Sequence, residues 1–228
     1  MISMKEPVIQ KLLRSPFYHL YLALVRYVYI IFLRRKKGLH VGSGLKLIGM
    51  PLIDIRGNAS VAIEDNVTLN SCNREYHVNM HSPVKLYADR NGAKIHIGKN
   101  TRIHGTCIHA CEHIKIGENC LIAANTQIFD GHGHDLSFDN TANRINTEGG
   151  TQPIIIEDDV WIGINCIIIG GVTIGKGSII GAGSVVTKSI PPFVIAAGNP
   201  ARIIKDMKCI EESQTEHLKR IQKVGNEK

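Results

Sequence analysis

Two histidines and two aspartates fall within one short segment, Asp130-Gly-His-Gly-His-Asp135. The imidazole ring exchanges a proton readily near neutral pH, so His132 and His134 are the candidates for a general base. Such a base could deprotonate the weakly acidic nucleophile of a group-transfer reaction. Either aspartate, Asp139 or a backbone carbonyl could orient its ring, and the residue types do not choose among them.

A six-residue repeat follows this segment and indicates the scaffold that must hold it. An aliphatic residue stands at every sixth position, namely Ile156, Ile162, Ile168, Ile174, Ile180 and Val186. Four positions after each of the first five comes a compact residue: Val160, Cys166, Val172, Ser178 and Ser184. This period fits neither the helix nor simple strand alternation. It predicts a coil with three flat faces, in which each face contributes an inward aliphatic residue and each corner a small residue.

Earlier segments carry the same register. Inward positions are predicted at Ile97, Ile103 and His109, then at Ile116, Ile122 and Ile128, with weaker copies at Ile63 and Leu69. His109 is thus expected to replace an inward aliphatic residue. Cys107, Cys120 and Cys166 occupy the compact corner position, so we interpret them as packing residues. The spacing of the six cysteines matches neither a zinc motif nor a secreted disulfide framework, which predicts reduced thiols and a cytoplasmic protein.

The repeat divides the chain into three parts. Residues 41–192 are predicted to form the solenoid, which is interrupted by an excursion loop over 130–153 and ended by Pro191 and Pro192. Long loops that leave a rigid scaffold commonly carry function. Residues 193–228 are expected to form a C-terminal extension with a charged helix beginning near Ala201.

Residues 1–40 form an apolar and basic N-terminal segment. The 17 residues from Phe17 to Leu33 are almost all apolar, with Arg26 in the middle, and the basic run Arg34–Lys37 follows. A helix of that length spans about 26 Å, which is short for a membrane crossing. Three interpretations stay open: the segment packs on the solenoid, lies in a membrane interface through residues 17–37, or spans the membrane.

The net charge of +7 limits the partners. Basic residues are mostly dispersed and no aromatic stripe alternates with them, which excludes a nucleic-acid binder. A nucleotide cofactor or an anionic membrane surface accounts for the charge better.

Four segments carry a resemblance to a known family: 153–163, Gly181-Ala-Gly-Ser-Val-Val-Thr-Lys188, Ile190-Pro-Pro192 and Gly198-Asn-Pro-Ala-Arg202. They resemble the bacterial-type hexapeptide-repeat acyltransferases, in particular the maltose, galactoside, nodulation-factor and polysaccharide O-acetyltransferases. The resemblance covers about 95–205. It implies a left-handed parallel β-helix, a homotrimer, and acetyl-CoA lying between neighbouring subunits, with no metal needed for the chemistry.

The resemblance also implies roles for individual residues. It favours His134 as the base, because an aliphatic residue follows it two positions later, with His132 second. Asp130 is one of the candidates for the partner that orients the base. The residues implied to meet the pantetheine arm are Trp161, Gly163, Ile164 and Ala182. Those implied near the phosphates, ribose and adenine are Thr187, Lys188, Arg202 and Lys205, and cations there would suit a polyphosphate. Ile164 departs from the small residue usual in the family, so a backbone contact is expected there but no hydroxyl contact.

The function expected from this resemblance is acetyl-CoA-dependent O-acetylation of a sugar or surface-polysaccharide precursor by direct attack. The acceptor pocket is expected around 72–90 and 130–150. An N-acetyltransferase acting on an amino sugar differs in acceptor only. Two alternatives belong to other functional classes, namely a non-catalytic scaffold and a zinc hydratase of the γ-carbonic anhydrase type. The histidines available for such a zinc site are His104, His109, His113, His132 and His134.

Overall fold

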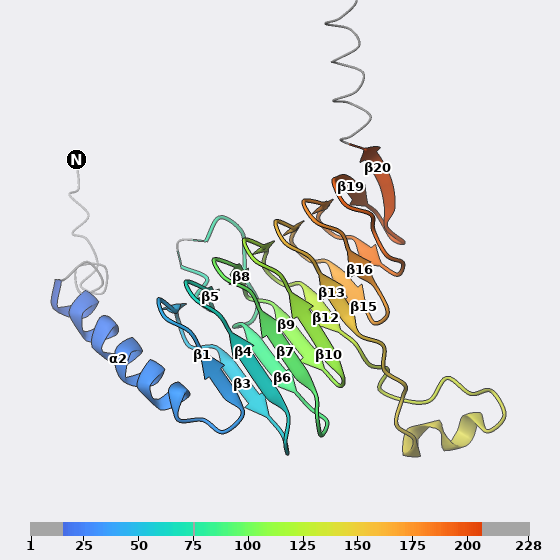
Figure 1. Ribbon diagram of the computed structural model, residues 1–228, viewed down its shortest axis with the longest axis horizontal. Coiled ribbons are helices and arrows are strands. Elements are labelled where there is room, and N and C mark those ends of the chain that lie inside the picture. Colours follow the sequence, from blue (N-terminus) through green and yellow to red (C-terminus); the bar gives the residue numbers. More distant parts are fainter. Residues whose placement is uncertain (1–15, 75, 207–228) are drawn as a thin grey trace, which may run out of the picture.

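The computed structural model describes residues 16–74 and 76–206, and its body is a coil of parallel strands (Figure 1). The chain visits three sheets in turn, here called A, B and C. Sheet A contains β1 (Leu39–Val41), β4 (Ser60–Ile63), β7 (Lys94–Ile97), β10 (His113–Ile116), β13 (Ile154–Ile156) and β16 (Thr173–Ile174). Sheet B contains β2 (Lys46–Ile48), β5 (Thr68–Asn70), β8 (Arg102–His104), β11 (Leu121–Ile122), β14 (Trp161–Ile162), β17 (Ile179–Ile180), β19 (Val194–Ala197) and β20 (Arg202–Asp206). Sheet C contains β3 (Leu52–Ile55), β6 (Lys85–Ala88), β9 (Cys107–Ala110), β12 (Gln127–Phe129), β15 (Ile167–Ile169) and β18 (Val185–Val186). This architecture confirms the predicted left-handed parallel β-helix.

The inward positions of the repeat form the core. All six aliphatic residues from Ile156 to Val186 are completely buried, as are Ile116 and Ile122. The compact positions are buried too, with Cys120 and Cys166 at 0% exposure. Since one apolar side chain from each face stacks on its equivalent in the next coil, the core is continuous along the solenoid.

The corners depend on residues that tolerate positive φ. Asn66, Asn100, Asn119 and Asn165 all have φ between 56° and 59°, in the left-handed region. Asparagine enters this region at a lower cost than most residues with a Cβ. Asn100 Nδ2 also donates to Asn119 Oδ1 at 3.1 Å, so equivalent corners are linked along the stack.

Two predictions for this part of the repeat were wrong by one residue: His109 was expected at an inward position and Cys107 at a compact corner position. In β9 it is Ile108 and Ala110 that are buried, whereas His109 and Cys107 face outward and are half-buried. The corner before β9 is one residue shorter than its equivalents, with Thr106 in the compact position at 0% exposure. Because successive strand residues alternate between faces, the missing residue reverses the orientation of the whole strand.

The C-terminal end also differs from expectation. β19 pairs with β17 in parallel, so the solenoid continues past Pro191 and Pro192, which occupy a corner turn. Residues 202–206 form β20, antiparallel to β19, and not the start of a helix. The remainder of the predicted helix and Cys209 lie outside the described residues.

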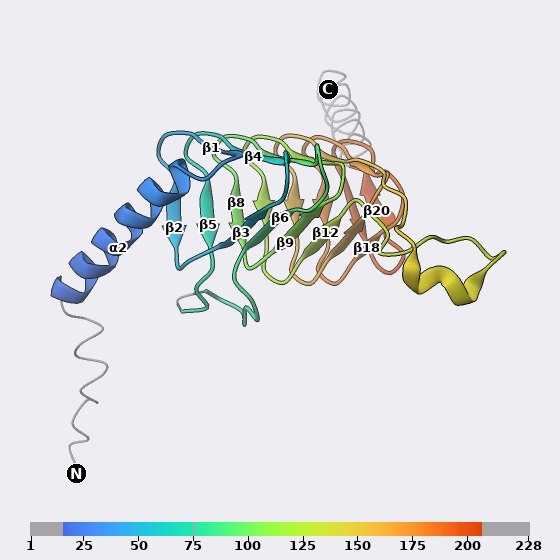
Figure 2. The same ribbon diagram turned by 90° about the horizontal axis from the view of Figure 1, so that it is seen from below.

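Helix α2 (Pro16–Arg34) contacts the first coil only near its C-terminal end. Leu33 is 2% exposed, and the Tyr29 hydroxyl donates to the Pro51 carbonyl at 3.0 Å. The rest of the helix extends away from the coils (Figures 1 and 2), and side chains such as Phe17 and Phe32 are 82% and 67% exposed. None of the helices in the described part of the chain combines the length and apolarity needed to cross a bilayer.

Candidate functional site

The excursion loop joins β12 of sheet C to β13 of sheet A and projects from the solenoid (Figure 2). Its base is tied by backbone bonds: His132 N–H donates to the Gly150 carbonyl at 2.9 Å, and Gly131 and Thr151 form an antiparallel bridge. Arg90 Nη1 donates to the Gly149 carbonyl at 3.0 Å, which ties the returning segment of the loop to the neighbouring coil. The farther part of the loop holds the short 3₁₀ helix η1 (Thr141–Asn146). These hydrogen bonds therefore anchor the base of the loop to the solenoid.

Asp130 is 1% exposed and its carboxylate binds backbone. Its oxygens accept from the N–H groups of Cys111, Glu112 and His113 at 2.6, 2.9 and 2.6 Å. These bonds hold the turn between β9 and β10. Within the described residues, Asp130 therefore stabilises this turn. None of these three hydrogen bonds joins its carboxylate to His132 or His134.

Replacing Asp130 by asparagine should lower the free energy of unfolding by about 3 kcal/mol, because an amide group would then face backbone donors in a buried position. Chemical denaturation followed by circular dichroism measures this. Asp139→Asn, in the exposed part of the loop, is the matched control and should change stability by less than about 0.5 kcal/mol. Equal stability of the two variants would show that the backbone bonds of Asp130 contribute little.

The two loop histidines differ in surroundings. His134 is exposed, and its Nδ1 lies 3.2 Å from the Thr147 carbonyl. A carbonyl only accepts, so Nδ1 carries the proton in a neutral ring and Nε2 is left free to accept one. His132 instead lines a groove of about 990 Å³ over sheet C. Other residues of this groove are Arg56, Asp89, Arg90, His109, Cys111 and Glu148.

A second, more apolar groove of about 560 Å³ runs over sheet B. Four residues predicted for the pantetheine arm, Trp161, Gly163, Ile164 and Ala182, line it together. A Cβ at Gly163 would come within 2.6 Å of the Ala182 nitrogen, so the coils pack closely there. The structure thus brings this part of the predicted site together.

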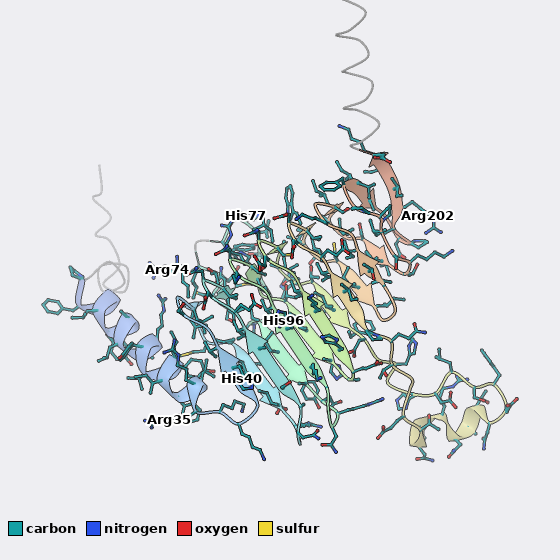
Figure 3. All side chains as sticks on the ribbon, in the orientation of Figure 1. Arg35, His40, Arg74, His77, His96 and Arg202 are labelled. Atoms are coloured by element: carbon teal, nitrogen blue, oxygen red, sulfur yellow. The ribbon has the colours of Figure 1, made fainter. Side chains whose placement is uncertain are left out.

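The predicted phosphate and nucleotide contacts are placed elsewhere. Thr187 and Lys188 follow β18 of sheet C and are exposed. Arg202 and Lys205 are exposed on β20, and Arg202 lies at the C-terminal end of the solenoid (Figure 3). None of these four residues lines the sheet B groove of a single chain.

Sequence reasoning missed His104 as a residue of the sheet B groove and named it only as a zinc candidate. The buried Asn70 accepts from Cys72 N–H through Oδ1 at 2.9 Å, which turns its Nδ2 toward His104 Nδ1 at 3.2 Å. His104 Nδ1 must therefore accept, and Nε2 carries the proton. Tyr76 stacks on the ring at 4.7 Å. Asn70 and His104 are 34 residues apart, so no local pattern could pair them.

His104 is held in its neutral form. Burial lowers the pKa of His104 below its usual range, and the charges of Arg102 and His77 lower it further. A neutral ring whose Nε2–H is fixed beside the groove is a hydrogen-bond donor at neutral pH. Such a donor suits an oxygen atom that gains negative charge.

The five histidines considered for a zinc hydratase are distributed over all three sheets and the loop. Within one chain, no three of them cluster in the described residues. The geometry of a single chain therefore gives that hypothesis no support.

The two grooves share no lining residue, and their walls belong to different sheets. The loop between β5 and β6, which contributes Tyr76 and His77 to the sheet B groove, leaves the solenoid at a different place from the excursion loop (Figures 1 and 2). A reaction that uses a loop histidine and the sheet B groove together would require a neighbouring copy of the chain.

Family models match both regular parts of the repeat. Residues 153–188 match bacterial transferase hexapeptide (six repeats), and residues 94–129 match the hexapeptide repeat of succinyl-transferase. The galactoside O-acetyltransferase of Escherichia coli is 43% identical over 120 residues, covering 51% of this chain and 56% of that protein. A putative acetyltransferase of Saccharomyces cerevisiae is 38% identical over 56% of this chain and 64% of its own length. The chain thus spans little more than half the length of the curated relatives that it matches.

Among solved structures, a hexapeptide-repeat acetyltransferase of Vibrio cholerae superposes with a TM-score of 0.52. The two are 27% identical, and the superposition covers 78% of each chain. A galactoside acetyltransferase in complex with coenzyme A is 44% identical over 50% of this chain and 55% of that one, with a TM-score of 0.46.

Proposed function

The chain belongs to the hexapeptide-repeat acyltransferase family, and we propose that it transfers an acetyl group from acetyl-CoA to a hydroxyl of a sugar or surface-polysaccharide precursor. The observation that carries this proposal is the sheet B groove. Its apolar wall suits a pantetheine arm, and it gathers Trp161, Gly163, Ile164 and Ala182. An assay of free thiol release from acetyl-CoA, with and without candidate sugars, tests the activity.

We propose a homotrimer, because within one chain the residues that such a reaction needs lie away from the groove proposed for the cofactor. The loop histidines, Lys188 and Arg202 lie away from the sheet B groove of their own chain. A neighbouring copy packed along the solenoid would supply them to that groove. The mass of the protein in solution, measured by light scattering, tests this assembly.

Filling the sheet B groove should weaken binding of coenzyme A. Ala182→Trp places an indole in the groove and should raise the Kd at least about tenfold, which corresponds to about 1.4 kcal/mol. Ile155→Trp is the matched control, because Ile155 is exposed on sheet A and lines neither groove. Calorimetric titration with coenzyme A measures both variants. Unchanged affinity in Ala182→Trp would place the cofactor elsewhere.

We propose that the acceptor enters the groove over sheet C. Its walls contain arginine, carboxylate and imidazole groups, which suit a ligand rich in hydroxyls. His132 lines this groove and is our candidate for the base, which would accept the proton of the attacking hydroxyl and return it to the leaving thiolate. His134, which the sequence favours, is the alternative, since its Nε2 is free.

An amino sugar would fit the same groove, so a chemical test of the product must distinguish O-acetylation from N-acetylation. Acetylated products are treated with mild alkali, which cleaves an ester and leaves an amide. We expect release of acetate. Retention of the acetyl group would make the protein an N-acetyltransferase.

We further propose that α2 contacts the inner face of the cytoplasmic membrane. Tyr21, Leu24 and Phe32 are 61%, 60% and 67% exposed, and the basic run from Arg34 follows them. We expect the protein to float with vesicles that contain anionic lipid but not with neutral vesicles, and Leu24→Glu/Phe32→Glu to abolish flotation. Flotation that is unchanged in the double variant would rule out this contact.

A further inference from the structure

One group of side chains on the floor of the sheet C groove has the composition of a metal site. Asp89, His109 and Cys111 each offer one ligand atom, and the three atoms lie within 4.8 Å of one another. His109 Nε2 is 3.3 Å from Asp89 Oδ2 and 3.7 Å from Cys111 Sγ. The carboxylate and the sulfur therefore both face the same ring nitrogen.

Hydrogen bonding accounts poorly for this arrangement. A single ring nitrogen cannot donate to Asp89 and accept from the Cys111 thiol at the same time, and 3.3 Å is longer than the usual bond between imidazole and carboxylate. In a tetrahedral zinc site, the known bond lengths place nitrogen and oxygen about 3.3 Å apart and nitrogen and sulfur about 3.6 Å apart. The observed separations of 3.3 and 3.7 Å match both values.

Neighbouring groups orient these side chains. The Tyr87 hydroxyl and Arg56 Nη1 both donate to Asp89 Oδ1, which leaves Oδ2 directed at His109. The Tyr87 ring also stacks on the His109 ring, with centroids 4.6 Å apart and planes at 18°. Contacts of this kind commonly fix the ligands of metal sites.

We propose that Asp89, His109 and Cys111 bind Zn²⁺, which accepts oxygen, nitrogen and sulfur ligands together. All three side chains line the groove, so water would complete the coordination. This site goes beyond the proposed acyl transfer, which does not use a metal. A bound ion would occupy the floor of the acceptor groove and inhibit competitively against the acceptor, not against acetyl-CoA.

Cobalt(II) provides the direct test on the full chain, because cobalt bound by a thiolate absorbs in the near ultraviolet. We expect this band at one equivalent of Co²⁺ and its loss on adding Zn²⁺. Cys111→Ser should abolish the band. Cys107→Ser, on β9 next to the cluster but outside it, is the matched control and should keep the band.

Asp89→Asn is the second variant and should weaken Zn²⁺ binding at least tenfold, measured in competition with a chromophoric chelator. Thermal unfolding of each variant checks that it is folded. Absence of the band in the parent protein, or a band unchanged in Cys111→Ser, would overturn the proposal. The binding measurements use neither acetyl-CoA nor an acceptor. Failure of the zinc site is therefore distinguishable from failure of the proposed activity.

Discussion

His132→Ala should lower kcat for acetyl transfer by about 10² to 10⁴-fold, the usual contribution of a positioned general base. The imidazole lines the groove in which we place the acceptor, and its backbone is fixed by the bond from His132 N–H to the Gly150 carbonyl. Coenzyme A affinity should change little, because the role proposed for His132 is to accept the proton of the acceptor hydroxyl and not to bind the cofactor. Steady-state assays of thiol release, combined with calorimetric titration of coenzyme A, measure both quantities.

His134→Ala is the matched control, since it removes an imidazole two residues away in the same loop. We expect its kcat to fall less than tenfold. The opposite result, with His134→Ala inactive and His132→Ala active, would assign the base to His134, whose ring is oriented by the Thr147 carbonyl. Full activity in both variants would exclude the excursion loop as the source of the base.

His104→Ala should lower kcat by about 10² to 10³-fold, which is the typical loss when one donor to a developing oxyanion is removed. The neutral ring carries its proton on Nε2 because Asn70 Nδ2 faces Nδ1, and the ring lines the sheet B groove. The KM for acetyl-CoA should change little, since the donor is expected to bind the transition state more strongly than the ground state.

Two further variants separate this role from a packing role. His104→Gln keeps an N–H donor and should recover part of the activity. Asn70→Asp removes the N–H groups that face Nδ1 and introduces a carboxylate, which favours a protonated Nδ1 and raises the pKa of the ring. We therefore expect a new inflection in the pH–rate profile of Asn70→Asp. Equal losses in His104→Ala and His104→Gln, with a pH profile unchanged in Asn70→Asp, would make His104 a packing residue.

Much of the fold could be predicted from the sequence because a solenoid repeats one local rule. Each aliphatic residue from Ile156 to Val186 packs against its equivalents in adjacent coils, so a period visible in the sequence corresponds directly to burial. The interruption after β12 could be recognised for the same reason, and it isolated the excursion loop. The short corner before β9 could not, and a one-residue error there was enough to place His109 in the core.

The arrangement of chemical groups was decided only by the tertiary structure. Trp161, Gly163 and Ile164 lie close together in a single coil and Ala182 lies in the next, and the parallel pairing of β14 with β17 brings them to one groove. The contact of Asn70 with His104, and that of Asp89 with His109, joins residues on neighbouring coils whose outward side chains the repeat does not constrain. Inward positions obey the packing of the core and recur along the sequence. Outward positions are free to vary, and their partners become known only when the coils are stacked.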